Sequence, residues 1–291
     1  MSWLTEYKNS LKMSEVEEYF DLFFYRPLAF LLVKLIYPTR ITPNQLTLIA
    51  IFFGIFSGFM YAMGSPNDFV IGALFFVMYN IFDCSDGQLA RLKKNGTHVG
   101  RIIDGIADYI ATISVFIGIG IGFANQQKNP VYWWSLVVIT GFSNVIHSIL
   151  VDYYRNRFLD YVLQRKSTFT DDLESFREKY KDIRDQKNKW LDRIIIKLYL
   201  GYSLFQNKLI VKDKNEIYFI ATPDDYYKKN KAVIKLWTII GPTSQITMLV
   251  ICSLLNRIDL FFWIIIIVFN SIAVMSWIFQ GNIDKSFKQV N

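Results

Sequence analysis

The chain has 291 residues, of which 52% are hydrophobic and 20% charged. A mean hydropathy of +0.24 at that charge content indicates long apolar blocks alternating with charged ones, which argues against a soluble domain and is typical of a polytopic membrane protein. The net charge is +7, and the basic residues flank apolar blocks, so we expect anionic lipid headgroups rather than nucleic acid as partners. Cys84 and Cys252 lie in different apolar blocks and predict neither a disulfide framework nor a CxxC metal site.

The N-terminal region, residues 1–42, starts with a polar stretch of mixed charge that does not resemble a signal peptide. Its apolar stretch over 14–37 is interrupted by Arg26, Pro27 and Lys34. We therefore expect an amphipathic helix that lies at the membrane interface rather than one that crosses the bilayer.

Six later segments are apolar for about 20 residues, which is the length needed to span a bilayer. They lie near 43–63, 68–91, 99–123, 131–155, 235–256 and 259–280. The predicted fold class is accordingly an all-α polytopic membrane protein with six transmembrane helices, an N-terminal interfacial amphipathic helix and a long cytoplasmic insertion between helices 4 and 5.

The spans divide the chain into an N-terminal region, helices 1–4, an insertion, and helices 5–6 with a tail: 1–42, 43–156, 157–234 and 235–291. Within the insertion, a charged helix, an amphipathic segment and a short strand pair are expected near 172–193, 194–205 and 210–222. Lysine and arginine gather in one set of connections, so we expect both termini and the functional site to face the cytoplasm.

Four aspartates interrupt the second and third spans at their adjoining ends: Asp83, Asp86, Asp104 and Asp108. Ionisable residues at membrane depth are costly and usually functional. On helices, spacings of three and four residues place each pair on one face, and two antiparallel helices would bring all four carboxylates together. A single aspartate at a helix end is commonly a cap or a solvated charge, but four in this arrangement repel one another unless cations bind. The all-oxygen donor set predicts two divalent cations, Mg²⁺ or Mn²⁺, suited to clamping a diphosphate.

Small residues accompany the first pair of aspartates. Gly87 and Ala90 continue the face of Asp83 and Asp86, so a ligand can approach the helix backbone closely. Arg91 follows at the same edge of the membrane, where its guanidinium is suited to phosphate oxygens.

The motif D-x2-D-G-x2-A-R-x8-G-x3-D-x3-D resembles the signature of the CDP-alcohol phosphotransferases (class-I CDP-alcohol phosphatidyltransferases). The chain matches all eight fixed positions between Asp83 and Asp108, including Gly100. The resemblance implies a homodimeric membrane enzyme of phospholipid biosynthesis. Such an enzyme transfers a substituted phosphate from a CDP-linked donor, usually CDP-diacylglycerol, to an alcohol and releases CMP.

The resemblance also implies roles for individual residues. The four aspartates would hold the two metal ions, and Asp108 would also act as the base that takes a proton from the attacking hydroxyl. Nucleotide and phosphate contacts would come from five positions: Asn44, Gly87, Ala90, Arg91 and Gly100.

The alcohol acceptor is less well marked. Asn144, His147 and Arg155 are polar residues in or beside the fourth span and are candidates for the acceptor pocket, although each could equally serve helix–helix contacts. The acceptor could be an inositol phosphate, a glycerol phosphate, serine or a lipid alcohol.

Three alternatives stay open at the level of sequence. A small CDP-alcohol could donate its head group to a lipid hydroxyl. A membrane prenyltransferase also uses aspartates with Mg²⁺, but it would need a second acidic motif. A cation transporter would place its carboxylates near the middle of the bilayer rather than at a basic edge.

Overall fold

The computed structural model describes residues 3–11, 13–96, 98–126, 129–164 and 222–287, with short pieces at 177–178, 180–182, 193, 196–197 and 200–201. Among these residues, six helices are long and apolar enough to cross a membrane. The predicted all-α polytopic fold is confirmed. Most of the predicted insertion at 157–234 lies outside the described residues, including most of the charged helix at 172–193, most of the amphipathic segment at 194–205 and all but one residue of the strand pair at 210–222.

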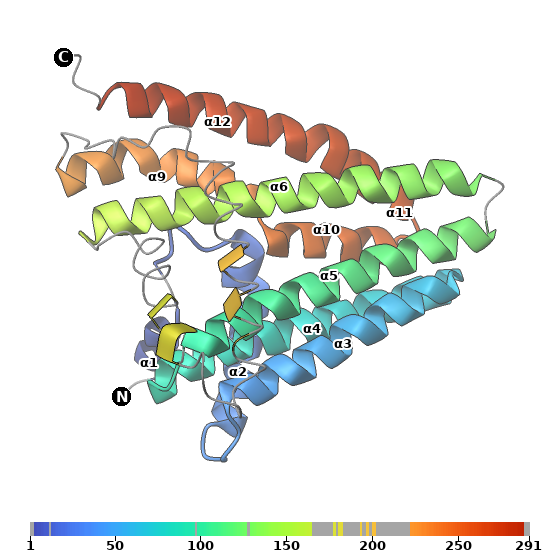
Figure 1. The fold of residues 1–291 in the computed structure, drawn as a ribbon, viewed down its shortest axis with the longest axis horizontal. Coiled ribbons are helices and arrows are strands. Elements are labelled where there is room, and N and C mark those ends of the chain that lie inside the picture. The colour runs from blue at the N-terminus through green and yellow to red at the C-terminus, as the bar shows by residue number, and fades with distance from the viewer. Residues whose placement is uncertain are drawn as a thin grey trace. The chain divides into compact units, whose positions relative to one another are not determined.

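The helices follow one another along the chain with short connections up to residue 162 (Figure 1). Their bounds are α1 Trp3–Ser10, η1 Asp21–Tyr25, α2 Arg26–Ile36, α3 Pro43–Met63, α4 Pro66–Lys93, α5 His98–Gln126, α6 Pro130–Val162, α9 Pro223–Ile239, α10 Pro242–Leu254, α11 Ile258–Trp263, η3 Ile264–Phe269 and α12 Asn270–Lys285.

The chain forms two compact units. The first comprises Met1–Ser148 and Thr238–Ala273 and contains the aspartate motif, and the second comprises Ile149–Trp237 and Val274–Asn291. Within the second unit, Arg157 pairs with Asp284 at 2.9 Å.

Local sequence fixes where the first two spans begin and end. Thr42 and Gln45 form a capping box at the start of α3, and Ser65 and Asp68 form another at the start of α4. Between the two helices, Gly64 adopts a φ of 85°, a left-handed conformation that ends α3 and allows the chain to reverse. The aspartates of α4 therefore lie at the end opposite its capping box.

Helices α3, α4 and α5 lie side by side in the first unit (Figure 1). The contact between α3 and α5 runs along two small-x3-small motifs, Gly54/Gly58 and Gly118/Gly122. A Cβ at Gly118 would overlap the backbone of Gly58, and a Cβ at Gly54 would overlap Ala111. Glycine therefore permits the close approach of these two helices, as in other membrane helix pairs.

The fifth span differs from the continuous helix predicted over 235–256. It begins earlier, as α9, and is interrupted between Ile239 and Pro242 before it continues as α10. Pro242 has no backbone N–H and its ring clashes with the preceding turn, so the helix restarts there with Pro242 in its first turn. The sixth span contains the π-helical segment η3, a feature that hydropathy does not reveal.

Candidate active site

Three of the four predicted aspartates meet in the first unit. Asp83 and Asp86 of α4 and Asp104 of α5 each offer one carboxylate oxygen, and the three oxygens lie within 4.8 Å of one another. Asp86 is buried, while Asp83 and Asp104 are partly buried. Repulsion among three like charges at this separation is large unless a cation compensates it.

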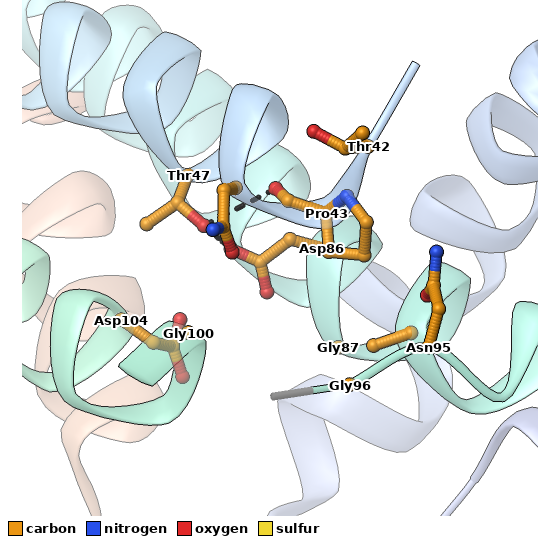
Figure 2. Close-up of a pocket in the computed structure, with 11 residues that line it drawn as sticks. Thr42, Pro43, Thr47, Asp86, Gly87, Asn95, Gly96, Gly100 and Asp104 are labelled. Atoms are coloured by element: carbon orange, nitrogen blue, oxygen red, sulfur yellow. Dashed lines mark hydrogen bonds between the residues drawn. The ribbon is translucent and has the colours of Figure 1, made fainter. Parts of the chain in front are cut away.

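The carboxylates of Asp86 and Asp104 line a cavity of about 280 Å³ (Figure 2). The cavity lies where the start of α3, the end of α4 and the start of α5 meet. The lining comes from the start of α3, the end of α4, the α4–α5 turn and the first turns of α5: Thr42, Pro43, Asn44, Thr47, Asp86, Gly87, Ala90, Asn95, Gly96, Gly100 and Asp104. The predicted nucleotide residues Asn44, Gly87, Ala90 and Gly100 are thus on the wall of a single cavity.

Thr47 holds the buried carboxylate of Asp86. The Thr47 hydroxyl lies 2.5 Å from Oδ2 of Asp86 and 3.2 Å from the carbonyl oxygen of Pro43, one turn earlier in α3. Figure 2 shows the Thr47 side chain on α3 next to the carboxylate of Asp86. Sequence reasoning missed Thr47, although its position one turn after Pro43 puts both residues on the same face of α3.

Asp108 lies outside the group of three carboxylates. Its Oδ1 accepts a hydrogen bond from the Tyr79 hydroxyl at 2.5 Å, and Tyr79 itself is buried. Asp108 is exposed and lies one turn beyond Asp104 on α5. The hydrogen bond from Tyr79 fixes the orientation of this carboxylate.

Arg91 is tethered at the edge of the cavity. Its Nε donates a hydrogen bond to the carbonyl oxygen of Ser10 at 2.5 Å. A Cβ added at Gly87 would lie 3.4 Å from one of its terminal guanidinium nitrogens, so the guanidinium rests against the Gly87 backbone. The terminal nitrogens are therefore next to a residue that lines the cavity.

Lys93 binds the loop that precedes α3, next to the cavity. Its Nζ donates hydrogen bonds to the carbonyl oxygens of Thr39 at 3.1 Å and Ile41 at 2.9 Å. The loop is thereby tied to the end of α4, and Thr42 follows directly. A lysine at the end of a helix looks like a solvated charge in sequence, so its role was not predicted.

The predicted acceptor residues are found in a different setting. Asn144 donates to Gln245 at 2.6 Å, and His147 is fully buried with Nε2 2.9 Å from Oδ1 of Asn270. Both are contacts between helices, which is the alternative role that the sequence allowed for these residues. Arg155 belongs to the second unit, and its assignment to an acceptor pocket stays a prediction, as do those of Asn144 and His147.

The arrangement suits a phosphorylated ligand. Carboxylate oxygens are the ligands that Mg²⁺ and Mn²⁺ prefer, and the clustered trio has no histidine or cysteine that would favour zinc. The neighbouring wall of Gly87, Ala90 and Gly100 presents little side-chain bulk to a bound molecule.

Comparison with known proteins agrees with the resemblance of the motif. The CDP-alcohol phosphatidyltransferase family model matches residues 40–160, which include the whole cavity lining. The chain is also 26% identical, over 139 residues, to a phosphatidylinositol phosphate synthase from Corynebacterium glutamicum. That match covers 48% of this chain and 55% of the relative, about half of each protein.

The matched region contains the trio of carboxylates, the cavity and Asp108. Among the readings left open by the sequence, these findings support phosphotransfer over prenyl transfer and cation transport. Residues 40–160 therefore form a CDP-alcohol phosphatidyltransferase domain, within a chain that spans about half the length of the relative it matches.

Proposed function

We propose that the enzyme transfers a phosphatidyl group from CDP-diacylglycerol to the hydroxyl group of a polar alcohol and releases CMP. The observation that carries this proposal is the trio of carboxylates, two of which, Asp86 and Asp104, line a cavity together with Gly87, Ala90 and Gly100. The name of the Corynebacterium relative, phosphatidylinositol phosphate synthase, makes an inositol phosphate the first acceptor to test.

The aspartates would hold two divalent cations, Mg²⁺ or Mn²⁺, with Asp83, Asp86 and Asp104 as the core of the site and Asp108 as the fourth ligand. Bound cations would neutralise the diphosphate and stabilise the charge that develops on the leaving phosphate. Gly87 and Ala90 leave room for the nucleotide along α4, and Asn44 and Gly100 face the same cavity. Arg91 would bind a phosphate oxygen from the edge of the cavity.

During the reaction, one proton passes from the acceptor hydroxyl to a residue of the chain. The acceptor oxygen attacks the phosphorus bonded to diacylglycerol, and a P–O bond forms as the bond from that phosphorus to the bridging oxygen breaks. CMP leaves with the bonding electron pair on that oxygen, and the hydroxyl proton passes to the carboxylate of Asp108. The hydrogen bond from Tyr79 orients this carboxylate.

We further propose that both termini and the cavity face the cytoplasm, where CDP-linked donors and polar acceptors are dissolved or presented at the interface. The gathering of lysine and arginine in the connections on one side of the spans supports this orientation. The amphipathic helix α2 supports the location of the N-terminal region at the membrane interface. It buries Ala29, Phe30 and Val33 while Leu31 and Leu35 are exposed, with Leu35 75% accessible, as expected for a helix at the membrane interface. A homodimer is proposed from the family alone.

The reaction is tested by incubating the purified protein with radiolabelled CDP-diacylglycerol, Mg²⁺ or Mn²⁺ and a panel of alcohols that includes inositol phosphate, glycerol phosphate and serine. CMP release that depends on one acceptor, and that Asp108→Ala abolishes, would support the proposal. A parallel experiment offers small CDP-alcohols as donors and diacylglycerol as acceptor. If CMP is released only in that experiment, the enzyme transfers a head group to a lipid hydroxyl, and the proposed phosphatidyl transfer is wrong.

Metal removal should stop the reaction completely and reversibly. We expect EDTA to reduce CMP release to background, because three carboxylates within 4.8 Å of one another neither bind nor neutralise a diphosphate without cations. Added Mg²⁺ or Mn²⁺ should restore activity, whereas Ca²⁺, with its longer and more variable coordination, should restore it poorly. Full activity in the presence of EDTA would contradict a metal-dependent mechanism.

Thr47→Val should lower the turnover number by about tenfold, because Asp86 loses the hydroxyl that orients it while the volume of the side chain is kept. Thr47→Ser keeps the hydroxyl and should retain most of the activity. The measurement is CMP release at saturating donor and acceptor over a range of Mn²⁺ concentrations. Equal activity of the valine and serine variants would show that the hydrogen bond to Asp86 is dispensable.

A further inference from the structure

The start of α10 lies buried within the first unit without a side-chain cap of its own. Gly241 is the N-cap residue and makes no side-chain hydrogen bond, and Pro242 follows at the first helical position. The N–H groups in the first turn of a helix have no partner within the helix. In an apolar surrounding an unsatisfied N–H is costly, so a partner from elsewhere in the chain is required.

Glu18 supplies that partner from the N-terminal segment. Its side chain is 2% exposed, and its Oε2 accepts a hydrogen bond from the backbone N–H of Ser244 at 2.7 Å, across 226 residues of sequence. A carboxylate at this end of a helix also interacts favourably with the helix dipole. A Cβ added at Gly241 would overlap the Glu18 carboxylate, so the glycine provides the space in which the carboxylate sits.

The same N-terminal segment is attached to α4 next to the aspartates. Gln88 donates a hydrogen bond to the carbonyl oxygen of Arg26 at 3.1 Å, and Arg91 donates to that of Ser10 at 2.5 Å. Gln88 and Arg91 both belong to the part of α4 that carries the motif. The segment therefore holds α4 on a face adjoining the one that lines the cavity.

The first turn of α10 carries polar contacts of its own. Gln245, next to Ser244, accepts from Asn144 at 2.6 Å and donates to the carbonyl oxygen of Ile240 at 3.0 Å, a carbonyl that the break in the helix leaves without its usual partner. One turn further, the Thr247 hydroxyl lies 3.3 Å from the hydroxyl of Tyr25, which ends η1. Two residues of the N-terminal segment thus reach α10.

We propose that Glu18 is a positioning residue for the transfer reaction: its carboxylate caps α10 in trans and so fixes the first turn of α10 with respect to the aspartate-bearing end of α4. The matched region of the family ends at residue 160 and begins at residue 40, so neither partner in this contact lies within it. The catalytic effect rests on the proposed function, whereas the capping contact does not.

A double-mutant cycle of Glu18→Ala and Gly241→Ala tests this contact. Gly241 has a φ of −67°, which alanine adopts readily, and the three atoms nearest to its new methyl group all belong to the Glu18 carboxylate. Each single substitution should lower the thermal midpoint of the detergent-solubilised protein by about 3–5 °C, the scale expected for loss of a helix cap. In a protein that already carries Glu18→Ala, adding Gly241→Ala should leave the thermal midpoint almost unchanged, because both substitutions disrupt the same interaction.

Activity is measured for each variant as CMP release with saturating CDP-diacylglycerol and acceptor, well below its thermal midpoint, so that unfolded protein does not account for a loss. We expect the turnover number to fall by about tenfold in each single variant and no further in the double variant. Glu18→Gln should keep most of the wild-type turnover number, because an amide oxygen can accept the same hydrogen bond. Glu15→Ala is the matched control, since Glu15 lies in the same segment and accepts an exposed hydrogen bond from the adjacent Ser14.

Additive effects on the thermal midpoint would overturn the capping contact. A non-additive thermal midpoint with unchanged turnover would leave the cap but overturn the positioning role. If the wild-type protein releases no CMP from any CDP-linked donor, the proposed function fails, while the thermal cycle still decides whether Glu18 caps α10.

Discussion

Replacing Asp86 or Asp104 by asparagine is expected to lower CMP release by about a thousandfold, the scale seen when one preorganised charge-stabilising group is lost from an active site. Asparagine preserves the size of the side chain and removes its negative charge. Both residues belong to the trio whose oxygens lie within 4.8 Å, and both line the cavity. Removing either charge therefore weakens cation binding at the point where the diphosphate is proposed to bind.

Thermal unfolding distinguishes a loss of cation binding from a loss of folded protein. In wild-type protein, Mn²⁺ should raise the thermal midpoint, because a ligand that binds only the folded state stabilises it by mass action. In Asp86→Asn and Asp104→Asn this increase should be largely lost. In EDTA, however, both variants should be as stable as the wild type or more stable, because one of three mutually repelling charges is gone.

Asp259→Asn is a suitable control. Asp259 is a carboxylate of the same unit that pairs with Arg257 at 3.0 Å on the exposed side of α11, and such pairs contribute little to stability. Its substitution should leave both the Mn²⁺ response and CMP release unchanged. An undiminished Mn²⁺ response in Asp86→Asn and Asp104→Asn would show that the cations bind elsewhere.

Much of this site can be read from local spacing. The separations Asp83/Asp86 and Asp104/Asp108 place side chains on common helix faces whatever the rest of the chain does, and the apolar spans identify the helices that carry them. The spacing predicts that all four carboxylates come together; three of them do, whereas Asp108 lies outside the group. Asn44, Gly87, Ala90 and Gly100 line one cavity.

The remaining parts of the site depend on contacts between distant residues, which spacing does not encode. Thr47 meets Asp86 across 39 residues, and Glu18 meets Ser244 across 226. In the sequence, Glu18 stands among other acidic residues at the start of the 14–37 stretch, where a solvated charge is the usual interpretation, yet it is buried. The break in the fifth span, by contrast, has a local cause in Gly241–Pro242, and a reading for turn dipeptides as well as hydropathy would have predicted it.

Gly118→Ala is expected to destabilise the protein by about 1–3 kcal/mol, as over-packing of a tightly packed contact usually does. The added methyl group would overlap the carbonyl group of Gly58, which belongs to the backbone of α3 and cannot rotate away as a side chain could. The helices α3 and α5 would have to separate, and they carry Thr47 and Asp104, both of which line the cavity. The Mn²⁺-dependent rise in the thermal midpoint should therefore shrink as well.

The same substitution at Gly105 provides the comparison, because Gly105 lies in the same helix and no neighbouring atom comes within 4 Å of the Cβ it would gain. Gly105→Ala should leave the thermal midpoint unchanged or raise it, since alanine favours the helix by up to about 1 kcal/mol over glycine. Thermal unfolding of the two variants in the same detergent measures the difference directly. Equal midpoints would mean that α3 and α5 do not approach as closely at Gly58 and Gly118 as described.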